Sequence, residues 1–222
     1  MAGTITALVA QKKRKNRVSV FLDGKFAFGL AAIEAMALRR GQLLSDADIA
    51  RLRALDDVEK AHERALRFLS FRPRSEAEVR RNLKDAEFAP PTIDAAIDSL
   101  KRAGLLDDRA FAQYWLENRG QFSPRSARAL KVELRRKGVA AETIDESLQA
   151  AAHGEDEVAF RAALARARRL AHLDAREFKH KLGAYLARRG FDYEVTLEAV
   201  RRAWQEVHAQ APDSSFDSAS ED

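Results

Sequence analysis

Arginine and lysine are the side chains of this sequence whose number and spacing could do chemistry. Their charged groups donate several hydrogen bonds at once, so a dense group of them binds phosphate or carboxylate oxygens. Such groups recur along the chain, and we interpret them as a basic face that binds a partner. The candidate residues are Lys12, Lys13, Arg14, Lys15, Arg72, Arg74, Arg80, Arg81, Lys84, Lys131, Arg135, Arg136, Lys137, Arg188 and Arg189.

A structural role competes with binding at each of these groups. The first group, together with Arg17, crowds the link between two predicted strands. There it either contacts phosphate or keeps a hairpin tip solvated, and in both cases we expect unburied cations. In the later groups, cations near a helix end stabilise the helix by about 0.3–1 kcal/mol through its dipole. That role does not explain their return at the same place in repeated units, so the sequence favours binding.

Catalytic chemistry has little support in this sequence. It has no cysteine, no GxxxxGK[ST] or GxGxxG loop and no HExxH pair. His172 and His180 could share a helical face, but two solvated histidines are favoured over a metal site. Nothing resembles a nucleophile elbow, and a dispersed serine triad stays the open alternative. We therefore predict a protein that is not an enzyme, with no catalytic residue, no metal and no cofactor.

The overall charge favours a polyanionic partner. The formal charge is +5, from 39 Lys+Arg against 34 Asp+Glu. The C-terminal segment 212–222 holds four of these acids and no base, which leaves the rest of the chain near +9. No run of about eighteen apolar residues is present, so no membrane span is expected. The absence of cysteine suits a reducing compartment, and we predict a cytoplasmic protein that works as a monomer.

The first thirty residues are predicted to form strands. Residues 4–9 are rich in β-formers, and residues 17–30 alternate apolar and polar side chains on two arms. Asp23 and Gly24 lie between the arms and suit a type I′ turn, which needs two positive φ angles. A short helix is expected near 31–39. Another should begin after Ser45, where Asp48 completes a capping box.

From about Asp57 onward the pattern is helical and repeats three times. Leu83, Leu134 and Leu186 lie 51 and 52 residues apart, and the same apolar frame surrounds each of them. We predict a mainly α fold of three tandem three-helix repeats that stack into an elongated curved array, preceded by a small β-rich segment. The expected divisions are the N-terminal segment 1–56, the repeats 57–106, 107–153 and 154–208, and a disordered acidic tail 209–222.

Capping signals place the middle helix of each repeat. Ser75 with Glu78 forms a capping box in the first repeat, and Ser123-Pro124 is predicted to begin the second middle helix. Gly138 and Gly190 are expected to end the second and third middle helices in the left-handed conformation. The first repeat has Glu87 at that place, so its turn should be less comfortable.

Several of these stretches resemble motifs of the RecX family. Arg74–Val79 with Leu83 is similar to the first-repeat motif, and Gly104–Ala112 resembles the junction between the first two repeats. Glu133–Val139 resembles the second-repeat motif, and Arg189–Tyr193 the third-repeat turn. The motifs occur in order between residues 58 and 204. The sequence departs from them at residues 85–88, where many members have a basic residue and glycine.

The resemblance implies a non-enzymatic regulator of the RecA recombinase. It implies a cytoplasmic bacterial protein that binds in the groove of the RecA filament on single-stranded DNA and suppresses ATPase, strand exchange and coprotease activity. A stand-alone nucleic-acid-binding protein is the alternative. Direct binding of single- or double-stranded DNA also stays open, and the salt dependence of binding separates these readings.

Overall fold

The computed structural model describes residues 2–12, 14–151 and 154–209. Within these ranges the chain forms ten helices and four strands, in two compact units, Met1–Leu106 and Asp107–Asp222. The predicted mainly helical fold with three three-helix repeats and a β-rich beginning is confirmed. The stacking of all three repeats into one array stays a prediction. The predicted acidic tail lies, from residue 210 on, outside the described residues.

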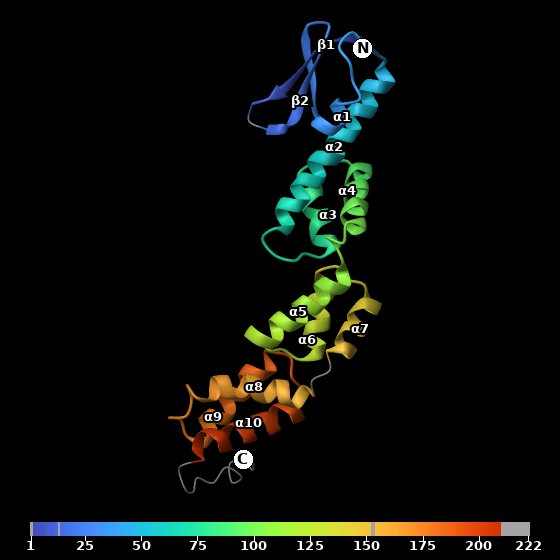
Figure 1. Ribbon diagram of the computed structural model, residues 1–222. Helices are drawn as coiled ribbons and strands as arrows, with labels where there is room; N and C mark the ends of the chain where they lie inside the picture. The colour runs from blue at the N-terminus through green and yellow to red at the C-terminus, as the bar shows by residue number, and fades with distance from the viewer. Residues whose placement is uncertain (1, 13, 152–153, 210–222) are drawn as a thin grey trace. The chain divides into compact units, whose positions relative to one another are not determined.

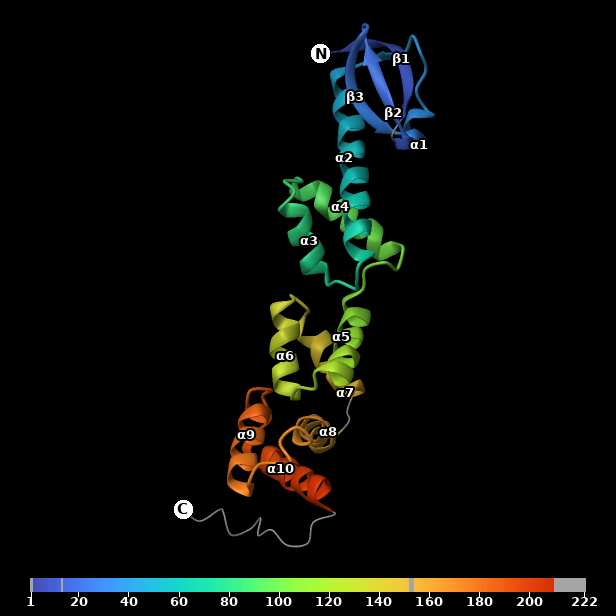
Figure 2. The same ribbon diagram turned by 90° about the vertical axis from the view of Figure 1, so that its left-hand side faces the viewer.

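The first unit begins with an antiparallel sheet of β1 (Gly3–Gln11), β2 (Arg14–Leu22), β3 (Lys25–Ala31) and β4 (Leu43–Leu44), in the order β3-β2-β1-β4. Figure 2 shows that its long strands curl around one another. Leu22 pairs with Lys25 across the turn between β2 and β3, and Asp23 and Gly24 have φ angles of 48° and 79°. The predicted type I′ hairpin is thereby confirmed.

A single long helix, α2 (Asp46–Leu69), joins the sheet to the first repeat (Figure 1). It begins with the predicted capping box of Ser45 and Asp48, and it is preceded by the short α1 (Ala32–Ala35). Ile49 and Leu52, in its first half, pack against the sheet. Two alanines in its second half, Ala61 and Ala65, are buried in the core of the first repeat. One helix therefore serves two cores.

The first repeat consists of the second half of α2 with α3 (Glu76–Lys84) and α4 (Pro90–Arg102). Its core gathers Val79 and Leu83 of the middle helix against Ile97 of α4. Both bonds of the predicted capping box are present at Ser75 and Glu78. Leu83, which the sequence repeat predicted as an anchor residue, is thus fully buried.

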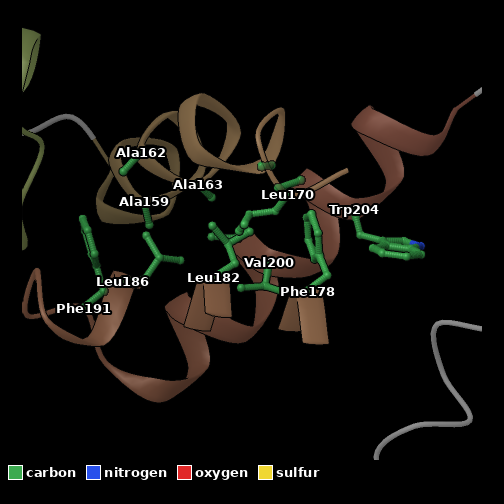
Figure 3. Close-up of a cluster of buried hydrophobic side chains, with 13 residues drawn as sticks. Ala159, Ala162, Ala163, Leu170, Phe178, Leu182, Leu186, Phe191, Val200 and Trp204 are labelled. Carbon is green, nitrogen blue, oxygen red and sulfur yellow. The ribbon is translucent and has the colours of Figure 1, made fainter. Parts of the chain in front are cut away.

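The second unit contains the other two repeats, each a helical trio around its own anchor leucine. Leu134 packs with Phe111 and Ile144, and Leu186 packs with Phe178 and Leu182. Figure 3 shows the latter cluster, with Trp204 at one end beside Phe178. The helices are α5 (Asp108–Phe122), α6 (Ala127–Arg136), α7 (Ala141–Ala150), α8 (Glu155–Ala167), α9 (Ala175–Ala187) and α10 (Tyr193–His208).

The predicted start of the second middle helix is wrong. Ser123 ends α5, and the N-cap of α6 is Ser126, whose hydroxyl accepts a hydrogen bond from the Ala129 amide at 3.1 Å. Ser126 is buried, and its own amide donates to the carbonyl oxygen of Arg189 at 3.1 Å. The third repeat therefore holds the start of α6, a long-range contact that local capping signals do not reveal.

All three middle helices end in the same turn. The amide five residues after the anchor donates to the anchor carbonyl, from Phe88, Val139 and Phe191 at 3.2–3.4 Å. The residue before that donor has positive φ, which is 81° at Gly138 and 88° at Gly190. Glu87 has a φ of 62° at the same place. The expectation of a less comfortable first turn is confirmed, because a side chain is disfavoured in this conformation.

Within the described ranges, no helix is both long enough and apolar enough to cross a bilayer.

Candidate interaction surface

The candidate cations whose side chains the structure describes divide into an exposed group and a group held by neighbouring side chains. The exposed group has no ion-pair partner in the part of the chain that the structure describes. On the middle helices it lies in or just beyond the last turn of each. Its members are Lys12, Arg81, Lys84, Arg135, Arg136 and Arg188. We call Arg81, Lys84, Arg135, Arg136 and Arg188 the helix-end cations.

A second set of repeated cations has a structural partner. Arg80 donates to Asp94 at 2.5 Å, and Lys131 pairs with Asp145. The two pairs occupy the same positions relative to Leu83 and Leu134, and each ties the middle helix to the helix that follows. A cation at this position in two repeats is therefore explained by an ion pair within each repeat, and not by the binding of a partner. The third repeat has Gly183 in place of the cation.

A charge network extends this link in the first repeat. The carboxylate of Glu76 accepts hydrogen bonds from Arg80 at 2.6 Å and from Lys101 at 2.5 Å. Partial burial works to raise the pKa of Glu76, but the bonds from Lys101 and Arg80 outweigh it and hold that pKa below its ordinary value. Bonds to Asp94 and Glu76 raise the pKa of Arg80. Arg80 is therefore committed to the α3–α4 contact.

Arg72 and Arg74 hold the loop before α3. Arg72 donates to Glu78 at 2.9 Å and to the Pro73 carbonyl at 2.8 Å. The guanidinium of Arg74 lies over the Phe68 ring, 4.0 Å from its centroid. Both side chains are half-buried, and their first role is to shape this loop.

In the second repeat, Glu133 binds an aromatic side chain and two arginines from the segment before its own helix. Its carboxylate accepts hydrogen bonds from the Trp115 ring nitrogen and from Arg119, both at 2.8 Å, and it forms an ion pair with Arg125 at 3.0 Å. The Trp115 ring also lies near two cations, with Lys137 at 4.4 Å and Arg119 at 4.6 Å from its centroid. Lys137 is thus packed on an aromatic ring. The role of Glu133 was not predicted, because its donors come from a helix and a loop preceding its own.

Arg189 joins the second and third repeats. It donates to the Ser123 hydroxyl at 3.1 Å and to the Pro124 carbonyl at 2.8 Å, and it lies over the Tyr185 ring. These contacts reinforce the bond between the Ser126 amide and the Arg189 carbonyl. The side chain predicted as a partner contact is therefore used inside the second unit.

The first basic group contains one cation whose side chain is buried. Arg17 is 4% exposed and binds Asp56 of α2 at 2.6 Å, while Lys60 binds the other oxygen of Asp56 at 2.8 Å. The expectation that this group stays unburied is wrong for Arg17, because its strand faces α2. Arg14 and Lys15 belong to the beginning of β2, and Lys13 lies outside the described residues.

Among the described residues, no group of three or more histidine, aspartate or glutamate side chains could hold a metal ion. His172 and His180, the pair weighed as metal ligands, are both exposed. His153 lies outside the described residues. The helix-end cations are exposed, and guanidinium and ammonium groups of this kind have the chemistry to bind anionic groups.

Comparison with known proteins relates these features to one family. The model of the regulatory protein RecX N-terminal domain matches residues 3–44. The models of the first, second and third RecX three-helix domains match residues 61–100, 107–148 and 154–200.

Curated relatives agree with the family models. The regulatory protein RecX of Bacillus licheniformis is 34% identical over 89% of this chain and 76% of its own length. That of Bacillus subtilis is 34% identical over 88% and 75%. A crystal structure of regulatory protein RecX aligns with a TM-score of 0.70 at 28% identity, over 90% of this chain and 99% of that one.

Proposed function

Because the chain belongs to the RecX family of regulatory proteins, we propose that it is a non-enzymatic regulator, and specifically an inhibitor, of the RecA recombinase. The relatives are named regulatory proteins, which favours regulation over catalysis. The observation that carries the proposal is the threefold repeat in which every middle helix ends in exposed cations. We place this activity in the cytoplasm and assign it to a monomer.

The repeats provide a mechanism for inhibition. A filament presents the same surface at regular intervals, so a chain with three similar modules can contact neighbouring protomers together. Weak contacts made by linked modules add up to strong binding. In this mechanism the protein lies in the groove of the RecA–single-stranded DNA filament and bridges protomers. It thereby blocks ATP hydrolysis, strand exchange and coprotease activity.

The test is the single-strand-dependent ATPase activity of the cognate recombinase, titrated with this protein at fixed, near-physiological salt. The proposal expects inhibition well below one molecule per recombinase protomer. If ATPase activity stays unchanged while the protein still binds naked DNA, the recombinase is not its target.

The helix-end cations of the second repeat give a sharper prediction. Arg135→Glu with Arg136→Glu should weaken binding to the filament by about tenfold, because these exposed cations are reversed in sign. The matched control is Arg39→Glu with Arg40→Glu, an adjacent exposed arginine pair in the N-terminal segment. Equal loss in both variants would show that net charge, and not this surface, governs binding. Filament affinity is measured by co-sedimentation.

A stand-alone nucleic-acid-binding protein is the second candidate, and the exposed cations are the observation that favours it. Binding that rests on phosphate contacts alone weakens steeply as salt rises, since each contact releases a counterion. Filament binding that also uses apolar contacts should persist at higher salt. Parallel salt titrations with naked DNA and with the filament separate the two functions.

A further inference from the structure

The third repeat contains a cavity of about 270 Å³ between α8 and α9. Its wall carries the cations Arg166, Lys181 and Arg188, with His180 and Tyr185 beside them. Leu170, in the turn after α8, contributes an apolar side. The residues that line the cavity include three cations and no carboxylate, which favours an anion as its ligand.

The helix geometry directs these groups to one place. Lys181, Tyr185 and Arg188 lie four and three residues apart, so Lys181 and Tyr185 share one face of α9 and Arg188, its C-cap residue, extends that face. Arg166 is in the last turn of α8, and its guanidinium carbon lies 5.9 Å from the centroid of the Tyr185 ring. The three cations and His180 are exposed, which leaves their donors accessible to a ligand.

The third repeat differs from the other two in the residues that could neutralise the positive charge at this site. The position of Tyr185 is occupied in the second repeat by Glu133, which binds Arg119 and Arg125. The position of Lys181 is occupied in the first repeat by Glu78, which binds Arg72.

The third repeat thus has an aromatic ring where the second has a carboxylate, and a cation where the first has a carboxylate. The acid that pairs with Lys181 is Glu177, at 3.4 Å, and both side chains are about half exposed. An exposed pair of this kind contributes little.

We propose that this cavity binds a phosphate group of a nucleic-acid backbone. A polymer of phosphates fits better than a single small anion, because positive charge continues beyond the cavity. Arg168 and Arg169 precede Leu170, and Arg176 lies one helical turn before His180. All three are exposed and make no ion pair in the described part of the chain.

A larger cavity of about 780 Å³ between the second and third repeats does not share this chemistry. There Arg125 and Arg161 are offset by Glu117 and Glu155. The surplus of positive charge therefore belongs to the cavity in the third repeat.

The experiment measures binding of a fluorescently labelled single-stranded oligonucleotide by the full-length protein, by anisotropy and without any recombinase. Arg166→Ala with Arg188→Ala should weaken binding by about tenfold and reduce the slope of log affinity against log salt by about 0.7, the value for one phosphate. The control, Arg39→Ala with Arg40→Ala, removes the same charge elsewhere and should change affinity by less than about twofold.

Two further binding measurements could contradict the proposal. Tyr185→Glu introduces the carboxylate that the second repeat has, and it should weaken binding as strongly as the double variant. Replacing chloride by inorganic phosphate at equal ionic strength should weaken the wild type more than the double variant, because free phosphate competes for the cavity. Equal losses in the cavity and control variants, or equal competition in both proteins, would assign binding to diffuse charge and overturn the proposal. Since no recombinase is present, the result does not depend on the proposed inhibition.

Discussion

Glu87 is a single residue that sets the first repeat apart from the other two. It holds a φ of 62° where Gly138 and Gly190 stand in the later repeats. A side chain in the left-handed conformation costs about 1–2 kcal/mol, and the larger chain entropy of an unfolded glycine offsets part of that cost.

Glu87→Gly should therefore raise the free energy of unfolding of the first unit by about 0.5–1 kcal/mol. Both tryptophans lie in the second unit, at Trp115 and Trp204, so fluorescence does not report on this change. Hydrogen exchange of the α3 amides does report on it. Unchanged protection of those amides would mean that the turn is not strained.

Glu76 gives the first repeat a dependence on pH. Its pKa in the folded protein lies below the ordinary value of 4.5, because the bonds from Lys101 and Arg80 outweigh the effect of burial. A group with a lowered pKa contributes stability above its ordinary pKa, and that stability is lost as pH falls through the folded value.

Glu76→Gln should consequently destabilise the first unit by about 1 kcal/mol at pH 7, and the difference should shrink below pH 4.5. Hydrogen exchange at several pH values measures it. Glu198→Gln is the control, since the ion pair of Glu198 with Arg201 is exposed and should contribute little. A difference that persists unchanged into acid would show that the carboxylate charge is not the cause.

Among the elements, the connection between α6 and α9 depends on a glycine. A side chain at Gly190 would place its Cβ 2.7 Å from the Ser126 hydroxyl and 2.8 Å from the Ala129 Cβ, at a φ of 88°. Gly104 has a φ of 67° and open space around its Cβ position.

Gly190→Ala should lower the melting temperature more than Gly104→Ala, because it adds a steric clash to a similar backbone cost of about 1–2 kcal/mol. Scanning calorimetry records both units and allows the comparison. Equal shifts in the two variants would mean that the contact between the second and third repeats contributes nothing to stability.

The sequence predicted the elements well where the signal was local. The Asp23-Gly24 turn, the capping box at Ser75 and the anchor Leu83 follow from spacing alone, and the structure contains all three. The start of α6 failed because Ser126 is held by Arg189 of the next repeat.

The residue types of the candidate site could be predicted from the sequence, but their contacts could not. The sequence reveals that cations recur at the ends of the middle helices, but it does not reveal which of them have partners. Arg80 is bound by Asp94, whereas Arg81 next to it is exposed and has no ion-pair partner within the described ranges. Separating the two requires the face of α3 that meets α4.

At the scale of the whole molecule, the distribution of charge between the body and the C-terminal segment should tune anion binding. The segment 210–222 contributes Asp213, Asp217, Glu221 and Asp222, without which the net charge rises from +5 to +9. Ending the chain at Ala209 should raise the affinity for a single-stranded oligonucleotide by about threefold at low salt. Full-length protein with these four acids changed to amides is the control, and it should gain as much. Affinity that stays the same in both would show that the acidic segment has no electrostatic effect on binding.

The helix α2 limits the insertions and deletions that this chain can tolerate. Its first half packs through Ile49 and Leu52, and its second half through Ala61 and Ala65. Each residue of a helix turns the chain by about 100°. One residue inserted or deleted between the two halves would therefore rotate one set of buried side chains away from its core while the other stayed in place. Substitutions of its exposed residues leave both cores in place, whereas a change in its length by even one residue does not.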